Sequence, residues 1–211
     1  KSRRFLRTTM SLSLTGKQNK PSIVEANFIQ KRFKLNKNDY ILYLGRIVPE
    51  KGIHYLIEAY SQIKTDKKLV IAGGSSDTDE YLKELKKMAN HNKNIVFTGF
   101  VQGQILDELY SNAYIYCLPS DLEGMPLSLL EAMSYGNCCL VSDIEECSSV
   151  VDDKAVIFKK SDVEDLKNKL TSLVNDSQLV KKYKEEAADY ILSKYDWDKV
   201  TDKTLGLYER N

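Results

Sequence analysis

The sequence has few glycines and prolines and no long apolar run. It contains 10 Gly and 4 Pro among 211 residues, too few for a collagen-like or low-complexity chain. No stretch approaches the roughly 18 consecutive apolar residues that a membrane-spanning helix needs. The first residues lack the apolar core of a secretory signal peptide. With 42% hydrophobic and 29% charged residues, the composition is typical of a soluble globular protein.

Neither sign of charge dominates the chain. Lys and Arg total 31 and Asp and Glu total 30, which leaves a formal net charge of +1. Such a balance gives no overall positive field to attract nucleic acid, so we expect no nucleic-acid partner. Any anion must therefore be bound by local geometry.

Four cysteines are present, and no two of them have the Cys-x-x-Cys spacing of a zinc site or a redox pair. Cys117, Cys138 and Cys139 lie in apolar runs, where reduced thiols behave as small hydrophobic side chains. We therefore expect no bound metal and a reducing, cytoplasmic compartment.

From Asp39 onward, short apolar runs alternate with segments of helical periodicity, which is typical of β-α-β units. The runs are nearly continuous in apolar character, as are parallel strands covered by helices on both faces. The pattern predicts an α/β fold over 39–211, a doubly wound, Rossmann-like parallel sheet with extra C-terminal helices. The expected strands are 40–44, 69–72, 95–98, 113–118, 138–142 and 155–158, the last at an edge. The expected helices are 52–63, 77–90, 105–111, 126–135, 162–174, 177–193 and 199–208.

Residues 1–38 are expected to form a partly disordered lead-in or linker. The first 20 residues are polar and basic, without a sustained period. Their cations could contact phosphates or lipid headgroups, although we favour a solvated terminus.

The loops that follow the strands are the candidate sites, because doubly wound sheets bind ligands beyond the carboxyl ends of their strands. After the first strand, Gly45 and Arg46 precede Lys51 and Gly52. Two cations beside the N-terminus of a helix suit a diphosphate. The alternative is that Lys51 faces solvent and Arg46 forms an ion pair.

A second loop runs from Pro119 to Pro126. Gly124 lets a ligand approach the backbone, and Pro126 suits the first helical position, so a phosphate could bind there. In the helix that follows, Glu131 lies at the shoulder of an apolar stripe and needs a partner, either protein donors or ligand hydroxyls. Glycines after two further strands, at 73, 74 and 99, are either turn residues or room for a base and a sugar.

Taken together, these segments resemble the retaining glycosyltransferases of family 4, which have the GT-B fold. Glu123 and Glu131 match the E-x7-E motif of that family within E-G-M-P-L-S-L-L-E. Four further segments follow in the family's order: G-R-x-x-x-E-K-G at 45–52, A-G-G at 72–74, F-T-G-F at 97–100 and Y-D-W at 195–197. The set is specific, and it covers the chain from about Asp39 onward.

The resemblance implies a site for a nucleotide-sugar donor, most commonly a UDP-sugar, with no further cofactor and no metal. Arg46 and Lys51 would bind the diphosphate, Glu131 the ribose hydroxyls and Glu123 the transferred sugar. Catalysis would involve Glu123, Arg46 and Lys51. By the same resemblance, the other donor-binding residues would be Gly45, Phe100, Val101, Gly124, Met125, Pro126 and Leu127, with Phe100 and Val101 at the base.

Members of that family have two Rossmann-like domains, and this chain corresponds to one. The resemblance therefore implies the C-terminal half of a hexosyl- or N-acetylhexosaminyltransferase acting on a polysaccharide or glycolipid. Its partner would be the missing N-terminal acceptor domain, without which we expect it to be inactive. The full-length enzyme would be cytoplasmic, with room for peripheral association at the inner face of the membrane. Two other interpretations stay open: a non-catalytic nucleotide-binding or regulatory module, and a sugar-nucleotide epimerase, which would need an acid and a base in the cleft.

Overall fold

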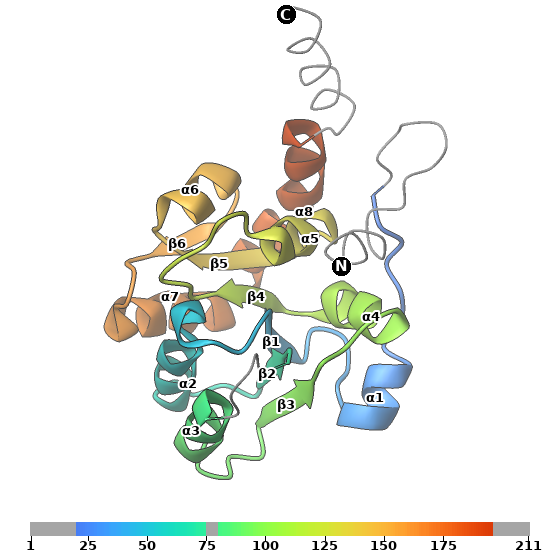
Figure 1. Cartoon of the computed structure of the whole chain (residues 1–211). Coiled ribbons are helices and arrows are strands. Elements are labelled where there is room, and N and C mark those ends of the chain that lie inside the picture. Colours follow the sequence, from blue (N-terminus) through green and yellow to red (C-terminus); the bar gives the residue numbers. More distant parts are fainter. Residues whose placement is uncertain (1–19, 75–79, 196–211) are drawn as a thin grey trace, which may run out of the picture.

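Six parallel strands form one sheet in the order β3-β2-β1-β4-β5-β6. The computed structural model (Figure 1) describes residues 20–74 and 80–195. The strands are β1 Tyr40–Leu44, β2 Lys68–Ala72, β3 Ile95–Gly99, β4 Ile115–Leu118, β5 Cys138–Ser142 and β6 Val156–Phe158. All six were expected from the sequence, and β6 is an edge strand as predicted. The doubly wound α/β fold is therefore confirmed.

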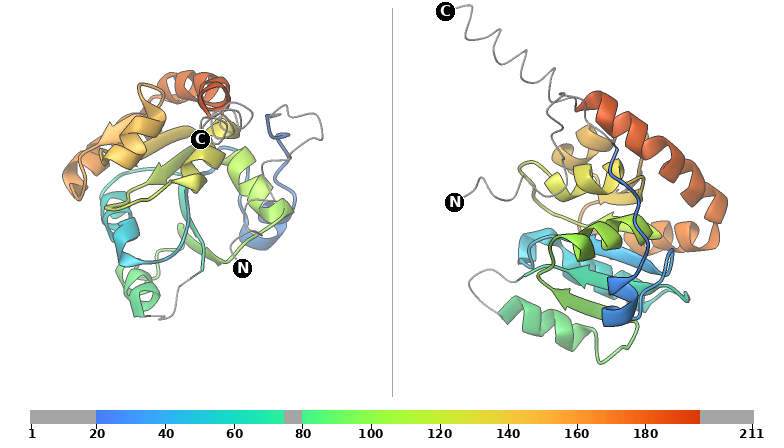
Figure 2. Two further views of the ribbon diagram at one scale, coloured as in Figure 1. Left: turned by 45° about the horizontal axis from the view of Figure 1, so that its top comes forward. Right: turned by 90° about the vertical axis from the view of Figure 1, so that its right-hand side faces the viewer.

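Helices cover both faces of this sheet (Figures 1 and 2). They are α1 Phe28–Phe33, α2 Ile53–Ser61, α3 Glu80–Met88, α4 Gln104–Asn112, α5 Leu127–Ser134, α6 Glu145–Val151, α7 Val163–Asn175 and α8 Ser177–Lys194, with a 3-10 turn, η2, at Pro49–Lys51. Helix α2 contacts α3 and α7, whereas α1 contacts α4. The sequence did not predict α1 or α6. The helix expected over 199–208 lies outside the described residues, as does Trp197.

The central strands are buried along almost their whole length. Every residue of β4 and of β5 is buried, and so are the first four residues of β1. Because helices cover both faces, both sets of side chains of each strand meet apolar surface. This burial explains why the apolar runs in the sequence are continuous and do not alternate.

The segment before β1 was expected to be a linker, but its described part packs against the domain. Ile29 and Leu35 are fully buried. The buried carboxylate of Glu108, from α4, accepts hydrogen bonds from the backbone N–H groups of Phe28 at 2.7 Å and Ile29 at 2.9 Å. A carboxylate is favourable at this N-terminal end of α1, where backbone N–H groups lack helical partners. Packing therefore begins ahead of the predicted boundary at residue 39.

The two long C-terminal helices were expected at the edge of the sheet, and the structure divides them between two places. Helix α7 contacts α2 and the edge strand β6, whereas α8 contacts α5 and β5. Lys184 of α8 donates to the backbone oxygen of Ala113 at 2.7 Å and to Asn38 Oδ1 at 2.8 Å. Burial lowers the pKa of Lys184 to about 8. None of the described helices combines the length and the apolar character of a membrane-spanning segment.

The order of strands reverses at the centre of the sheet. The chain moves outward from β1 through β2 to β3, then crosses back to β4 and moves outward on the other side to β6. Doubly wound sheets bind ligands at such a reversal, beyond the carboxyl ends of the two central strands. The loop at residues 45–52 (the β1 loop) and the loop at residues 119–126 (the β4 loop) meet there.

Candidate functional site

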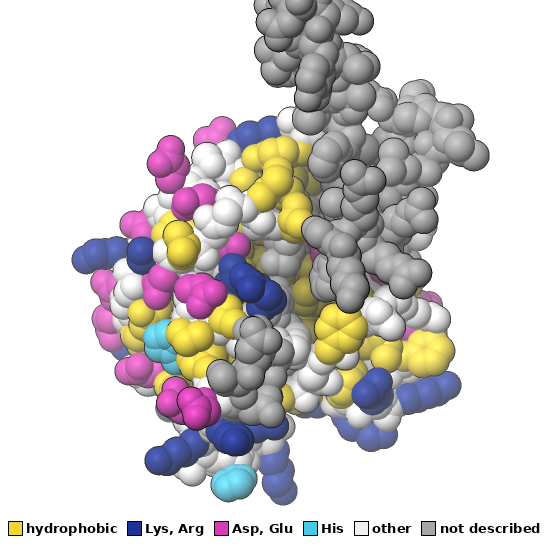
Figure 3. Space-filling model, in the orientation of Figure 1, with side chains coloured by type: hydrophobic (Ala, Val, Ile, Leu, Met, Phe, Trp, Pro, Cys, Tyr) yellow, Lys and Arg dark blue, Asp and Glu magenta, His cyan; other side chains and the backbone are white. Residues whose placement is uncertain are grey.

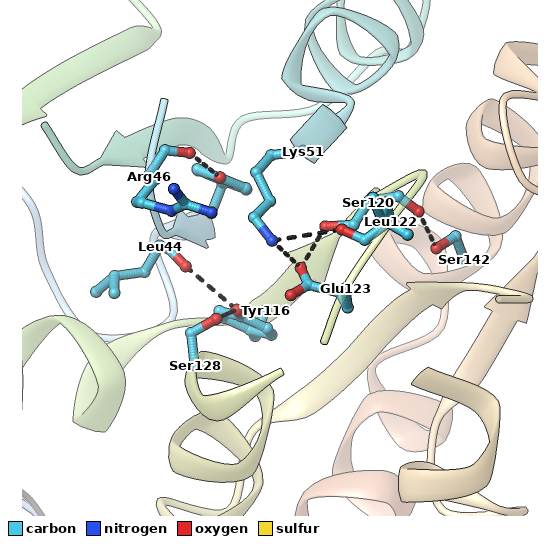
Figure 4. A network of polar contacts seen from close by, with 10 residues as sticks. Leu44, Arg46, Lys51, Tyr116, Ser120, Leu122, Glu123, Ser128 and Ser142 are labelled. Atoms are coloured by element: carbon cyan, nitrogen blue, oxygen red, sulfur yellow. Dashed lines mark hydrogen bonds and ion pairs between the residues drawn. The ribbon is translucent and has the colours of Figure 1, made fainter. Parts of the chain in front are cut away.

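The β1 loop presents two cations to the same space. In Figure 4, the Arg46 guanidinium and the Lys51 ammonium both extend into the space at the ends of the central strands. Arg46 is exposed, and within residues 20–74 and 80–195 no acidic side chain forms an ion pair with it. Tyr43 Oη donates to the backbone oxygen of Arg46 at 2.7 Å, which fixes the chain as it leaves β1. The arrangement leaves the guanidinium available to an anionic ligand.

Lys51 is paired with Glu123 across the two loops. Its Nζ lies 2.7 Å from Glu123 Oε1, and the two side chains are only 11% and 8% exposed. The same ammonium donates to the backbone oxygen of Leu122 at 3.5 Å (Figure 4). The alternative in which Lys51 faces solvent is therefore wrong. The two residues that the sequence assigned to the diphosphate and to the sugar are in direct contact.

The described donors to the Glu123 carboxylate all bind the same oxygen, Oε1. Ser120 Oγ donates to Oε1 at 2.7 Å, beside the Lys51 ammonium. In the described chain, neither hydrogen bond nor ion pair reaches Oε2. Figure 4 shows this second oxygen turned toward the space between Lys51 and Tyr116. Glu123 is therefore anchored through Oε1 and keeps Oε2 as an acceptor for a ligand.

Ser120 is itself fixed from the neighbouring strand. It is fully buried, and Ser142 Oγ, at the end of β5, donates to its backbone oxygen. Ser120 is not among the site residues expected from the sequence. Its position just after β4 and three residues before Glu123 was the only available signal.

Asp121 ties the β4 loop to three other elements. Its backbone N–H donates to the Glu50 oxygen in η2 at 2.8 Å. Its carboxylate accepts from Tyr55 Oη of α2 at 3.1 Å and from Ser161 Oγ at 2.7 Å. These bonds hold the two loops together, so the contact between Lys51 and Glu123 is built into the fold.

Glu131 is positioned by a buried tyrosine. Tyr110 Oη, from α4, donates to Glu131 Oε2 at 3.0 Å. Burial, reinforced by the Glu131 carboxylate, raises the pKa of Tyr110 well above its usual value, so the phenol stays protonated as a donor. The ring of Tyr110 stacks on Tyr135 with centroids 5.3 Å apart, and Tyr135 Oη donates to Asp107 at 2.8 Å. The partner that this carboxylate requires is thus supplied by the protein, and the sequence did not predict it.

A second tyrosine links the strands beneath the two loops. Tyr116 Oη forms a hydrogen bond with Ser128 Oγ of α5 at 2.8 Å and donates to the Leu44 backbone oxygen at 3.4 Å (Figure 4). Burial raises the pKa of Tyr116 well above its usual value, so it is a neutral hydroxyl in the ordinary pH range. It joins β1, β4 and α5 at the floor of the site.

The predicted base-binding residues follow β3, two strands away from β1. Phe100 is 58% exposed and Val101 is buried. Backbone hydrogen bonds of 3.0 Å connect the loops after the first three strands: Gly45 N–H to the Ala72 oxygen, Ile47 N–H to the Gly74 oxygen and Gly73 N–H to the Gly99 oxygen. The structure therefore brings these loops to one edge of the sheet.

The predicted residues that follow Glu123 form an open rim. Gly124, Met125 and Leu127 are exposed and Pro126 is buried. The sequence predicted Pro126 as the first residue of the helix, but α5 begins at Leu127 and Pro126 is the residue just before it. Figure 3 shows that this face of the molecule is hollowed near its centre, with cationic and apolar side chains at the border.

The histidine with a described hydrogen bond, His54, lies in the first turn of α2, directly after the β1 loop. His54 Nδ1 is 2.8 Å from Tyr81 Oη, which connects α2 with α3. Burial lowers the pKa of His54 and raises that of Tyr81 to about 12. Within the described residues, no contact joins either group to Glu123, so the structure offers no support for the acid and base that an epimerase would need.

A metal site was not expected from the sequence. Over residues 20–74 and 80–195, no group of three or more His, Cys, Asp or Glu side chains could hold a metal ion. Because a ligand's own oxygens can complete a metal site, independence from metal stays a prediction.

Sequence comparison relates the chain to glycosyltransferases. Residues 24–190 match the family described as Glycosyl transferases group 1. An uncharacterized glycosyltransferase of Methanocaldococcus jannaschii is 30% identical over 173 residues, which cover 80% of this chain and 44% of that protein. The O-antigen chain mannosyltransferase B of Escherichia coli is 28% identical over 86% of this chain and 48% of its own length. The chain spans about half the length of the curated relatives it matches.

Structure comparison gives the same fold. Anabaena Alr3699/HepE in complex with UDP and glucose has a TM-score of 0.79 at 17% identity, over 87% of this chain and 52% of that one. The C-terminal domain of a glycosyl transferase group 1 family protein, LpcC, from Francisella tularensis has a TM-score of 0.69 at 24% identity. That match covers 79% of this chain and 90% of the solved domain.

Proposed function

The chain belongs to the Glycosyl transferases group 1 family, and we propose that it is the donor-binding half of a retaining, metal-independent glycosyltransferase. The observation that carries the proposal is the meeting of Arg46, Lys51 and Glu123 where the strand order reverses. Two cations and an anchored carboxylate suit a ligand with a diphosphate at one end and hydroxyls at the other. A nucleotide-sugar has this composition.

In the proposed reaction, Arg46 and Lys51 stabilise the leaving diphosphate. Negative charge develops on the diphosphate as the bond to the sugar breaks, and preorganised cations lower the energy of that state. Two such side chains provide charge stabilisation that other enzymes obtain from a metal ion. Glu123 accepts hydroxyls of the sugar through Oε2, and Glu131 accepts the ribose hydroxyls.

The rest of the donor would bind beside these charged side chains, and the acceptor would bind to a second domain. Phe100 and Val101 would contact the nucleotide's base. The open rim from Gly124 to Leu127 would complete the pocket for the transferred sugar. The resemblance of this chain to an O-antigen chain mannosyltransferase favours a polysaccharide or glycolipid acceptor. A second, N-terminal domain would bind that acceptor, so this chain by itself would bind the donor without transferring sugar. The whole enzyme would act in the cytoplasm, with peripheral association at the inner face of the membrane.

Thermal-shift screening against UDP-, GDP- and ADP-sugars tests the donor site directly. A ligand that binds only the folded chain stabilises it, by about 2.7 kcal/mol at 100 times its Kd. We expect one nucleotide series to raise the melting temperature, with UDP-sugars first. Arg46→Ala, which removes an exposed guanidinium, should abolish most of the shift at the same concentration while leaving the ligand-free melting temperature unchanged. No shift with any series would refute the proposed function.

Glu131→Gln should weaken the preference for ribose over deoxyribose. The wild type is expected to bind UDP about tenfold more tightly than 2′-deoxy-UDP, because a hydroxyl donating to a carboxylate forms one of the stronger hydrogen bonds. In Glu131→Gln, calorimetry should give a clearly smaller preference for UDP, because the neutral amide oxygen only partly replaces the carboxylate as an acceptor. Glu123→Gln is the matched control and should keep the preference for ribose. Equal binding of both nucleotides by the wild type would mean that Glu131 is a packing residue held by Tyr110.

A further inference from the structure

The Lys51 ammonium has more donors than its contacts use. An ammonium group carries three N–H bonds. One meets Glu123 Oε1 at 2.7 Å and a second meets the Leu122 oxygen at 3.5 Å, so one remains for a ligand. Lys51 can therefore bind a phosphate oxygen and keep its contact with Glu123 at the same time.

The contact with Lys51 also sets the orientation of the Glu123 carboxylate. Lys51 and Ser120 both bind Oε1, and Oε2 faces the space between Lys51 and Tyr116 (Figure 4). The pair is nearly buried, so water does not easily replace either donor. A change at Lys51 would therefore release the carboxylate as well as remove a cation.

We propose that Lys51 is a positioning residue for the donor sugar as well as a ligand of the diphosphate. One ammonium group would couple recognition of the two ends of the donor, because it holds the carboxylate that meets the sugar. This inference rests on the proposed function of the site and adds a role for Lys51 within it. The product nucleoside diphosphate lacks the transferred sugar and so has no hydroxyls of that sugar to offer Glu123; the coupling therefore also favours donor over product.

Arg46 provides the contrast within the same loop. It is exposed and has no described acidic partner, so its effect should be confined to the diphosphate. Removing Arg46 should weaken UDP and a UDP-sugar by the same factor. Removing Lys51 should weaken the UDP-sugar by the larger factor.

The test is the ratio of two dissociation constants, Kd for UDP divided by Kd for UDP-glucose, measured by calorimetry on the 211-residue chain. UDP-galactose or UDP-N-acetylglucosamine replaces UDP-glucose if it gives the larger thermal shift. Lys51→Met should lower the ratio to the value of Glu123→Gln, a change of about tenfold. Arg46→Ala should leave the ratio within about twofold of the wild type, although both affinities fall. The double variant Lys51→Met/Glu123→Gln should lower the ratio no further than either single variant, because the two act through one contact.

Ser120→Ala keeps the test decisive if Lys51→Met folds poorly. It removes the other donor to Oε1 and leaves both cations, so it should lower the ratio without changing the affinity for UDP. An unchanged ratio in Lys51→Met and in Ser120→Ala would overturn the inference, as would a wild-type ratio of one. Either result leaves the donor site itself intact if UDP still binds. Absence of UDP and UDP-sugar binding by the wild type would instead refute the proposed function.

Discussion

Gly52→Ala is expected to lower the free energy of unfolding by about 2 to 5 kcal/mol and to weaken UDP binding. Gly52 has φ of +62°, and a Cβ there would lie 2.0 Å from the Pro119 backbone oxygen and 2.9 Å from the Tyr55 ring. The left-handed backbone costs an ordinary residue about 1 to 2 kcal/mol, and overpacking adds about 1 to 3 kcal/mol. The obstacle is backbone, so the β1 and β4 loops must move apart, and Lys51 and Glu123 move with them. Urea unfolding and calorimetry with UDP measure the two effects.

Gly99→Ala separates the two causes. Gly99 has φ of +71°, but a Cβ there would meet nothing within 4 Å. This variant should lose only the backbone contribution, about 1 to 2 kcal/mol. If Gly52→Ala loses no more stability than Gly99→Ala, close approach of the two loops is not what requires glycine at position 52.

The strands could be predicted because their burial leaves a direct trace in the sequence. A strand such as Cys138–Ser142 is covered on both faces, so each of its side chains had to be apolar or small. The reversal of strand order could be anticipated only as part of the fold class. Once that class was inferred, the rule that ligands bind beyond the carboxyl ends led to the right loops.

Two helices could not be predicted, for different reasons. Helix α6, with the sequence E-E-C-S-S-V-V, combines serine and β-branched residues that have modest helix propensity and is too short for a clear period. Helix α1 has only one buried residue and depends on Glu108, far along the chain. A contact between distant segments leaves no periodic trace in the sequence, which therefore predicts a linker there.

The same limit applies to the site. The sequence supplied Arg46, Lys51, Glu123 and Glu131 through residue type and position at strand ends. It could not supply the side chains that orient them, because Ser120 and Tyr110 act across elements whose contacts appear only after folding. Nor could it show that Lys51 and Glu123 are partners, since they lie 72 residues apart and meet only when the β1 and β4 loops come together.

Lys51→Met is expected to lower the free energy of unfolding by about 3 kcal/mol in the absence of ligand. The variant leaves the Glu123 carboxylate with Ser120 as its one described donor. The Glu123 side chain is only 8% exposed, so water cannot easily replace the lost ammonium. Removing one partner of a buried ion pair destabilises proteins by about 3 to 5 kcal/mol, because the remaining charge is unpaired. The lower end applies here because the site opens at the surface. Urea unfolding at neutral pH measures the loss.

The double variant Lys51→Met/Glu123→Gln should recover most of that stability. With both charges gone, the amide of the new glutamine can still accept from Ser120, and a neutral pair of similar volume is often no less stable than the ion pair. Glu123→Gln alone should cost less than Lys51→Met, because a lysine can extend its ammonium toward water whereas the shorter carboxylate cannot. If Lys51→Met lowers the free energy of unfolding by less than about 1 kcal/mol, the pair contributes no more than an exposed ion pair does. That result would mean that water reaches Glu123 freely. Glu123 would then need no cation to hold it, and the coupling between diphosphate and sugar would lose its physical basis.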